Sequence, residues 1–535
     1  MGSNLFQPSD NLLLLGLAPR NNPSYVSGFF MEDKMSLEES LSEIIKEEAK
    51  KLIKRYHAYH NRLHLEHIRN IKRFGHSYTK AKEIHTPDYW EKDKRFNPFH
   101  VLRKHKSIAH SIAKKIENRT YKPSEVHLKQ IPKKGGGERT VSIYQIPDAA
   151  VSKFFFNRLL EKNKHRFSSF SYAYRNDRNV HFAIQDIFVD LSLSERMFIA
   201  EFDFSDFFGT IEHRFLFEQF NLNGFYISQE EKYIIKAFLA ERSVGIPQGT
   251  SISLFLANLC CWNFDQALER EGVKFSRYAD DTIVWTREYS KICNAFNLIT
   301  EFSKSAGVKI NVKKSDGISL LTKDGLKSEI VSKKSLDFLG YSLAVDKVSI
   351  KHSSVLKIKK QISYLLYRNL IQPLKKGNLA GQSIPANDKD VNFLRAMVQI
   401  RRYMYGGLQD TTIKNFLSGR SKRIFFKGVM SFYPLVTNER QLRELDGWLV
   451  STIYRALLLR SKLLAQHGYN RNHSFPFNQS KVNLLTNCSK VKINGKKLLE
   501  IPSFLLISKA LRKGLIENGI ERVMNPNSQN YNYRW

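Results

Sequence analysis

Residues 275–285 read FSRYADDTIVW, and this stretch sets two aspartates, Asp280 and Asp281, side by side. The residues around them are mostly aromatic or β-branched, types that are enriched in strands, so the stretch predicts a β-hairpin with the two acids at its tip. Two adjacent ionised carboxylates repel each other unless a cation lies between them or close by. The pair therefore indicates a site that holds cations.

A third acid ends an earlier strand-like stretch. Residues 198–208 read FIAEFDFSDFF, in which Phe198 to Phe204 is apolar-rich and Asp203 lies at the end of the predicted strand. A strand ending in Asp203 next to the hairpin would gather three carboxylates, and two Mg²⁺ ions would relieve their repulsion. Such a site serves in-line phosphoryl transfer, with one ion activating the attacking hydroxyl and the other the leaving phosphate. A single aspartate of this kind is commonly a turn or N-cap residue, whereas the set in this order favours the two-metal site.

The composition is that of a large globular protein with a polyanionic partner. The 535 residues are 42% hydrophobic and 25% charged, which allows a large core and predicts two to four lobes. The 85 Lys and Arg residues outnumber the 51 Asp and Glu residues, which gives a net charge of +34. Such an excess repels itself and usually meets a polyanion, so nucleic acid is the leading partner and an anionic membrane surface the second.

The details of the sequence argue against a membrane. The apolar run from Leu12 to Leu17 is too short to span a bilayer, and Asp10 rather than a basic region precedes it, so it is not a secretory signal. No CxxC pair occurs, so neither a disulfide framework nor a zinc ribbon is predicted. We therefore expect a reduced, cytoplasmic protein whose four cysteines are Cys260, Cys261, Cys293 and Cys488.

The chain divides into three regions. Ser36 to Glu39 form a capping-box pattern, and no Pro or Gly follows until Gly75, which predicts one long helix or two abutting ones. The second half of this segment is strongly basic. We predict an N-terminal helical basic extension over 1–100, alternating helices and short strands over 101–345, and a mostly helical region with a mobile polar tail over 346–535.

Four histidines in the basic segment are a candidate metal ligand set. Their spacing of three, four and three residues places them near one helical face, and they are His57, His60, His64 and His67. The alternative is a packed or RNA-facing stripe, since Tyr56 and Tyr59 lie among them. Structural zinc usually recruits cysteine and draws ligands from more than one element, which favours the stripe.

Seven motifs occur in the order found in reverse transcriptases, and the chain resembles that family over residues 100–345. The motifs are IPKKGGGERTVSI (131–143), SYAYRNDRNVHFAI (171–184), FDFSDFF (202–208), GIPQGTSIS (245–253), YADD (278–281), GVKINVKKS (307–315) and FLGYS (338–342). A single motif is weak evidence, but seven in order are specific. The resemblance implies an α+β right-hand polymerase with fingers and an antiparallel palm sheet over 101–345, and a helical thumb after it. It also implies copying of RNA or DNA templates into DNA.

The resemblance assigns roles to the acidic residues. It implies that Asp203, Asp280 and Asp281 are catalytic, and that the metal ligands are Asp203, Phe204, Asp280 and Asp281. It implies two Mg²⁺ ions, for which Mn²⁺ can substitute. The substrates would be deoxynucleoside triphosphates, with an RNA template and a DNA product.

Basic and glycine-rich motifs predict the nucleotide contacts. Lys133, Lys134 and Arg139 flank the glycines at 135–137, which predicts a hairpin with a flexible tip that lays cations on a triphosphate. An ordinary basic turn is the alternative. In GIPQG, Gly245 and Gly249 would let the backbone approach the nascent base pair closely.

Three further residues take substrate-binding roles from the resemblance. It places Gln248, beside Gly249, near the sugar of the incoming nucleotide. It matches Lys314 to a lysine that protonates the leaving pyrophosphate, although a surface lysine is the alternative. Phe208, five residues after Asp203, would lie under the sugar and exclude a 2′-hydroxyl, whereas hydrophobicity alone equally favours Phe208 as part of the palm core.

The C-terminal region narrows the resemblance. No acidic RNase H cluster is legible after residue 345, and Cys488 stands alone, unlike the paired cysteines of many intron endonucleases. The stretches IRRYMYGGL (400–408) and LDGWLVSTIYRALLLRSKL (445–463) resemble bacterial defence-associated reverse transcriptases of the unknown groups. That subgroup implies anti-phage activity, a structured noncoding RNA partner that serves as template, and a homo-oligomer. The alternatives are a group II intron-type maturase acting as an RNA-binding splicing factor, a retron-like enzyme, and a catalytically idle RNA-binding scaffold.

The last eleven residues, NPNSQNYNYRW, raise the question of priming. They are polar and without apolar periodicity, so the tail is predicted to be mobile. Some relatives of the defence groups start DNA synthesis on a protein hydroxyl, and the candidate protein primers here are Tyr531, Tyr533 and Ser528. The alternative is a tail that stacks on bound RNA or packs on a neighbouring subunit.

Overall fold

The computed structural model describes twelve stretches of the chain. They are residues 35–76, 80–83, 86–132, 137–222, 224–240, 242–312, 315, 317–323, 332–375, 385, 390–469 and 475–528. Several predictions lie outside these residues, namely those for the run at 12–17 and for Lys133, Lys134, Lys314, Tyr531 and Tyr533.

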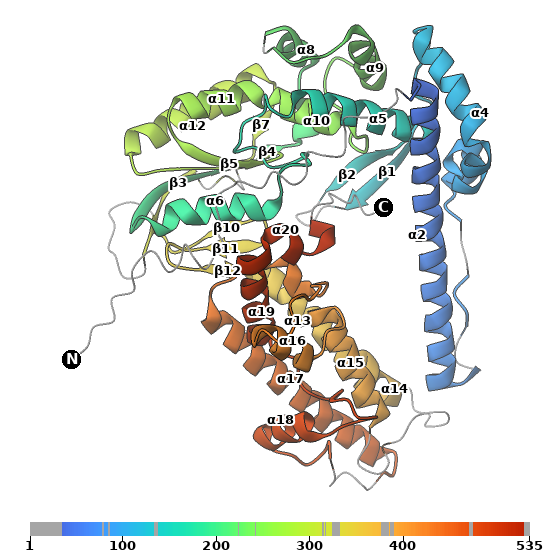
Figure 1. Cartoon of the computed structure of the whole chain (residues 1–535), viewed down its shortest axis with the longest axis vertical. Helices are drawn as coiled ribbons and strands as arrows, with labels where there is room; N and C mark the ends of the chain where they lie inside the picture. Colours follow the sequence, from blue (N-terminus) through green and yellow to red (C-terminus); the bar gives the residue numbers. More distant parts are fainter. Residues whose placement is uncertain are drawn as a thin grey trace.

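The predicted N-terminal helix is one continuous element, α2 (Leu37–Phe74). Ser36 and Glu39 form the capping box at its start, and Gly75 ends it at φ 79°, as the sequence predicted. Its first half buries apolar side chains against α4 (Pro98–Glu117) and α5 (Ile146–Asn163). Its second half runs on as a long column beside the thumb (Figure 1). There the ring of His60 packs 3.9 Å from that of Tyr56, centroid to centroid.

A five-stranded sheet forms the palm. Its strand order is β5-β6-β3-β8-β9, with bounds Lys274–Tyr278, Asp281–Thr286, Arg196–Phe202, Gly317–Thr322 and Ser332–Lys333. All pairs are antiparallel except β8 with β9. Alternate residues of β3 enter two different cores: Ile199 joins the thumb side, whereas Ala200 and Phe202 join the fingers side. The sheet is therefore buried on both faces, which fixes the register of its strands.

Short elements surround the palm. The fingers hairpin consists of β1 (His127–Pro132) and β2 (Glu138–Ile143), and a small pair joins β4 (Phe204–Ser205) to β7 (Lys309–Ile310). The helices of this region are α3 (Tyr89–Lys92), η2 (Lys94–Phe96), α6 (Val180–Ser192), α7 (Phe207–Thr210), α8 (His213–Leu222), α9 (Gln229–Leu239), α10 (Ile252–Cys260), α11 (Trp262–Arg270) and α12 (Tyr289–Ser305).

The C-terminal part is helical after one small sheet. That antiparallel sheet contains β10 (Leu336–Phe338), β11 (Tyr341–Leu343) and β12 (Val348–Ile350). The helices that follow are α13 (His352–Leu366), η3 (Tyr367–Ile371, a π-helix), α14 (Gln372–Lys375), α15 (Val391–Tyr405), α16 (Asp410–Leu417), η4 (Val429–Phe432), α17 (Glu439–Gln466), α18 (Lys481–Lys490), α19 (Phe504–Asn518), α20 (Ile520–Val523) and η5 (Pro526–Ser528). The predicted apolar face of α17 is buried at Leu449, Ile453 and Leu457.

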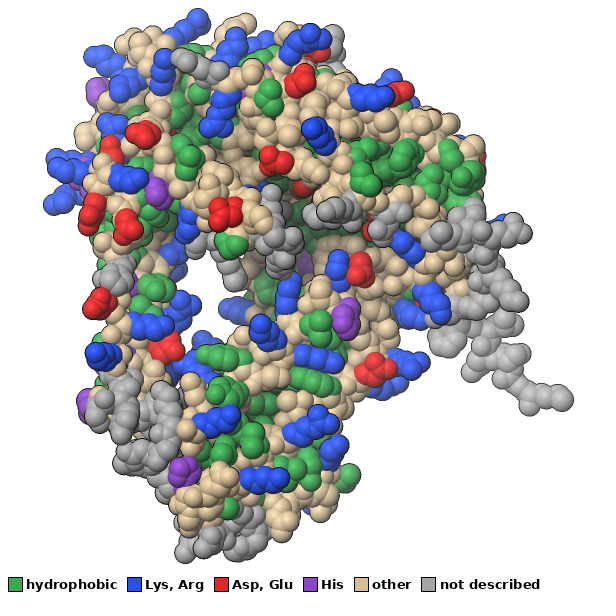
Figure 2. All heavy atoms as spheres, turned by 180° about the vertical axis from the view of Figure 1, so that it is seen from behind, with side chains coloured by type: hydrophobic (Ala, Val, Ile, Leu, Met, Phe, Trp, Pro, Cys, Tyr) green, Lys and Arg blue, Asp and Glu red, His purple; other side chains and the backbone are tan. Residues whose placement is uncertain are grey.

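The arrangement is the predicted α+β right hand, with fingers, an antiparallel palm sheet, a helical thumb and an N-terminal helix (Figure 1). Seen from behind, the molecule has an opening between the column of α2 and the thumb, and Lys and Arg side chains line much of its rim (Figure 2). Within the described residues, no helix is long and apolar enough to cross a membrane. All four cysteines are free thiols.

Candidate active site

The paired aspartates lie where the sequence predicted them, at the tip of the β5–β6 hairpin. Tyr278 pairs with Asp281, so Ala279 and Asp280 form the turn. Ala279 has φ 63°, a left-handed conformation that makes a two-residue turn tight enough to join neighbouring strands. Asp280 is half-buried and the side chain of Asp281 reaches solvent. Both acids are therefore presented at one edge of the palm sheet.

Asp203 follows directly on the neighbouring strand. In the register of β3 with β6, Phe202 pairs with Thr282, which places Asp203 beside the hairpin tip. Its carboxylate Oδ2 accepts a 2.9 Å hydrogen bond from Asn311 Nδ2, and its carbonyl accepts one of 2.8 Å from the Asn311 N–H. Its own N–H donates to Ser315 Oγ at 3.2 Å. Asn311 and Ser315 thus hold Asp203 in one orientation.

The three acids influence one another electrostatically. The pKa of Asp281 is raised from its usual value near 3.8 to about 7, first because surrounding protein atoms displace part of the water around the carboxylate, although the residue still reaches solvent. Negative neighbours add to the shift, in the order Asp280, Asp203 and Glu201. Glu201 is itself paired with Lys333 at 2.5 Å. A cation near the tip would reverse these effects, because it stabilises the ionised carboxylates.

The donor set suits a hard divalent ion. Carboxylate oxygens are the ligands that Mg²⁺ prefers, and Phe204 can add only its backbone carbonyl because its side chain has no ligand atom. In the described residues, no group of three or more His, Cys, Asp and Glu side chains is arranged to hold one metal ion. Asp203, Asp280 and Asp281 thus share an edge of the sheet without converging on a single point, and a bound ion would draw on substrate oxygens as well.

A buried arginine under the hairpin positions the tip. Arg277 is fully buried and donates from Nε and Nη2 to both carboxylate oxygens of Asp265, at 2.7 and 2.6 Å. It also donates to the carbonyl of Ala279 at 3.1 Å, and to Asn258 Oδ1 and Ser171 Oγ at 3.2 and 2.7 Å. Burial opposes its charge, but the carboxylate of Asp265 outweighs that effect and raises the pKa of Arg277. The turn that carries Asp280 is therefore tied directly to the helices behind the sheet.

Hydrogen bonds connect the fingers hairpin to the glycine loop, residues 245–249. Arg139 Nε donates to Gln248 Oε1, and the Ser142 N–H donates to the Gln248 carbonyl at 2.8 Å. A Cβ on Gly249 would lie 2.2 Å from the Ser142 carbonyl oxygen, and its φ of 114° also requires glycine. Gly249 thus allows the chain to pass close to the backbone of β2, whereas the sequence predicted a close approach to the nascent base pair. Arg139 and Gln248 are brought together, whereas Lys133 and Lys134 lie outside the described residues.

Phe208 lies in the core under this loop. Only 4% of its surface is exposed, and it contacts Phe207 and Tyr174 edge to face. Its carbonyl accepts a 2.7 Å hydrogen bond from the Ile246 N–H, which fixes the glycine loop against α7. Packing in the palm core and the predicted role as sugar gate both fit this position, and the gate stays a prediction.

Among the three candidate primer residues, Ser528 is the one that lies within the residues the structure describes. It ends η5, where its N–H donates to the carbonyl of Asn525 at 2.8 Å, and its hydroxyl is buried. Asn525 is anchored to η4 through Ser431. The Ser528 hydroxyl would have to leave this packed turn to act as a primer.

Sequence reasoning missed the residues that hold the aspartates in place. Arg277 stands inside FSRYADD, but its partners Asp265, Asn258 and Ser171 lie outside that motif, and no local pattern links them to Arg277. Asn311 stands inside GVKINVKKS, where Lys314 drew the prediction. A polar residue next to a short apolar strand was the available signal for Asn311.

Comparison with known proteins identifies this part of the chain. The family model described as reverse transcriptase (RNA-dependent DNA polymerase) matches residues 131–343. These residues include the fingers strand β2, the palm sheet and the three aspartates. Residues 131–343 are therefore similar to a reverse transcriptase domain.

Individual relatives are more distant. Protein YkfC of Escherichia coli (strain K12) is 26% identical over 159 residues, which cover 28% of this chain and 42% of that protein. The chain thus spans less than half the length of this curated relative. Solved telomerase structures are also similar to the chain. The telomerase of Candida albicans in complex with a TWJ fragment of telomeric RNA is 13% identical with a TM-score of 0.33. That match covers 74% of this chain and 69% of the telomerase chain. The apo telomerase of Candida tropicalis has 11% identity and TM-score 0.33, covering 78% and 68%.

Proposed function

We propose that the chain is an RNA-templated DNA polymerase whose active site is the edge of the palm that carries Asp203, Asp280 and Asp281. The observation that carries this proposal is that the three carboxylates lie at one edge of adjacent palm strands, in the part of the chain that matches a reverse transcriptase model. The net charge of +34 supports a nucleic-acid substrate.

The metal in this proposal is Mg²⁺, two ions per site, with Mn²⁺ as a substitute. When bound, the ions would lower the pKa of the primer hydroxyl and neutralise charge on the leaving pyrophosphate. Asp203, Asp280 and Asp281 would hold them, with the carbonyl of Phe204 as a further ligand. Asn311 keeps Asp203 oriented, and Arg277 holds the turn at Asp280, so both acids stay at this edge of the sheet.

The nucleotide would lie between the fingers hairpin and the palm. Arg139 would offer its guanidinium to the triphosphate, and Gln248, which is hydrogen-bonded to Arg139, would contact the sugar. Phe208 lies below and would exclude a 2′-hydroxyl. Lys133 and Lys134 are proposed to add charge to the triphosphate, and Lys314 to protonate pyrophosphate.

The biological setting that we propose is anti-phage defence in the bacterial cytoplasm. The support is the likeness of residues 400–408 and 445–463 to defence-associated enzymes, together with the basic surface around the opening (Figure 2). A structured noncoding RNA would serve as template, the chain would act as a homo-oligomer, and no membrane would take part. Priming would use a tail hydroxyl, with Tyr531 and Tyr533 ahead of Ser528 because the Ser528 hydroxyl is buried.

Primer extension on a defined RNA template tests the activity. Wild-type protein should add deoxynucleotides in Mg²⁺ and stop when EDTA is added. Asp280→Asn should lower the rate by about 10³-fold or more, the scale expected when a preorganised charged group is removed from an active site. Glu444→Gln, which changes an exposed acid of α17, should extend at the wild-type rate. Extension by Asp280→Asn near the wild-type rate would contradict the proposal.

A further inference from the structure

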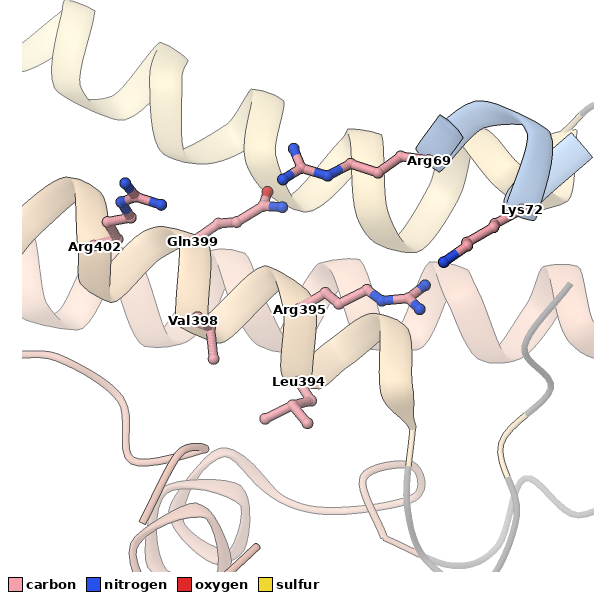
Figure 3. Close-up of a pocket in the computed structure, with 7 residues that line it drawn as sticks. All are labelled: Arg69, Lys72, Leu394, Arg395, Val398, Gln399 and Arg402. Carbon is pink, nitrogen blue, oxygen red and sulfur yellow. The ribbon is translucent and has the colours of Figure 1, made fainter. Parts of the chain in front are cut away.

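A pocket of about 490 Å³ lies where the end of α2 meets the thumb helix α15. Its lining carries four cationic side chains and two apolar ones, namely Arg69, Lys72, Arg395, Arg402, Leu394 and Val398, together with Gln399 (Figure 3). A second, adjoining pocket shares Arg69 and Arg402 and adds Arg368 from η3. Both pockets therefore join the N-terminal extension to the thumb through basic side chains.

Among the described residues that line the α2–α15 pocket, the cations face one another without an acid between them. Lys72 and Arg395 point toward each other from opposite walls, and Arg69 reaches over Gln399 from the same side as Lys72 (Figure 3). Among the described residues, no carboxylate forms an ion pair with Arg69, Lys72 or Arg402. Facing like charges repel, so this arrangement is unfavourable unless an anion enters the pocket. The lining would suit a phosphate group, which accepts hydrogen bonds from guanidinium and ammonium donors alike.

The pocket lies at the point where the molecule closes on itself. α2 packs on α5, and α5 packs on α10 of the palm. The palm shares one core with α13 and α15 of the thumb. Arg368 of η3 then pairs with Glu66 of α2 at 3.2 Å, across 302 residues of sequence. These contacts form a ring around the opening in Figure 2, and the α2–thumb contact is its exposed joint.

We propose that backbone phosphates of a nucleic-acid strand occupy the α2–α15 pocket and hold the ring closed around that strand. This inference rests on the proposed polymerase, because it supplies the nucleic acid. A phosphate between Lys72 and Arg395 converts their repulsion into attraction to a shared anion and so draws α2 onto the thumb. The strand that passes through the opening is then enclosed.

Charge reversal tests the phosphate site. Lys72→Glu combined with Arg395→Glu should weaken RNA binding, and lower the slope of log affinity against log salt by about 1, because the protein no longer neutralises the phosphate that these two side chains share. Arg214→Glu is the matched control, because Arg214 lies on α8 with 90% of its side chain exposed and should leave affinity and slope near wild type. An unchanged slope in the double variant, or an equal weakening in the control, would overturn the pocket assignment.

Cross-linking tests the closed ring. Glu66→Cys with Arg368→Cys, in a Cys293→Ser background that removes the one cysteine that is not buried, allows a short bismaleimide to lock the joint. Cross-linked after binding, the protein should stay on a circular RNA through a high-salt wash but leave the same RNA in linear form. Protein that is cross-linked before RNA is added should fail to bind the circular RNA. Equal retention on both RNAs, or loading regardless of order, would overturn the ring. Primer extension by the uncross-linked variant is scored separately, so failure of the polymerase proposal is distinguishable.

Discussion

Two arginine–carboxylate pairs hold two parts of this molecule, and their surroundings are opposite. Arg277 and Asp265, under the β5–β6 hairpin, have side chains 1% and 0% exposed. Arg368 and Glu66, at the joint between α2 and the thumb, have side chains 22% and 35% exposed. The buried pair cannot separate without leaving an unpaired charge in the core, whereas water and salt reach the half-buried pair at the joint and weaken it. The hairpin that carries the proposed chemistry is thus held by a buried ion pair, and the joint by one that solvent reaches.

The largest expected effect comes from breaking the buried pair. Asp265→Asn should lower the free energy of unfolding by about 3–5 kcal/mol, because it leaves the charge of Arg277 buried without a negative counter-charge. Chemical denaturation monitored by fluorescence measures this change. A cost under about 1 kcal/mol, the usual value for an exposed pair, would mean that the hairpin is not held by this ion pair.

The next effect separates packing from nucleotide selection in the palm. Phe208→Ala and Phe207→Ala both truncate buried rings, 4% and 2% exposed, and each should cost about 3 kcal/mol or more of stability. Only Phe208→Ala should admit ribonucleotides, measured as the ratio of rNTP to dNTP incorporation below the melting temperature. Equal ratios in both variants would reject Phe208 as the sugar gate and leave it as core.

A smaller effect concerns the raised pKa of Asp281. A folded-state pKa of about 7 means that the folded protein binds this proton more tightly than the unfolded chain, whose value is near 3.8. Its stabilising contribution is complete below about pH 4 and is lost as the pH rises to about 7. Asp281→Asn should therefore raise the stability at pH 8 in EDTA, by about 1 kcal/mol after allowance for solvent screening, and not at pH 4.

Mg²⁺ provides the control for Asp281. Added Mg²⁺ should raise the melting temperature of the wild type at pH 8 more than that of Asp281→Asn, because a ligand that binds the folded state stabilises it. A variant that is less stable than the wild type in EDTA at pH 8 would contradict the electrostatic explanation.

The smallest effect is expected at the joint. Glu66→Gln removes one charge of a half-buried ion pair with Arg368 that solvent still reaches, so it should cost about 1 kcal/mol or less. Thermal melts at low and high salt measure it, and the difference from wild type should vanish at high salt. A destabilisation as large as that of Asp265→Asn would remove the contrast between the two regions.

The parts predictable from sequence are those set by neighbours in the chain. The capping box at Ser36, the stop at Gly75 and the hairpin around Asp280 depend on interactions within a few residues, so local patterns revealed them. Asp203, Asp280 and Asp281 could be predicted because they stand inside motifs that occur in the order found in reverse transcriptases. Arg277 was missed because its role depends on Ser171, 106 residues away, and the joint because Glu66 and Arg368 are 302 residues apart. Such pairings are determined by the packing of whole elements, which local patterns do not encode.

Parallel measurement of RNA affinity and primer extension in two variants tests the central claim most directly. Asp280→Asn should bind the RNA template with wild-type affinity and fail to extend the primer. Lys72→Glu with Arg395→Glu should bind RNA more weakly, yet extend the primer at the wild-type rate once the template is saturating. If Asp280→Asn extends the primer near the wild-type rate, the palm edge at Asp203, Asp280 and Asp281 is not the polymerase site.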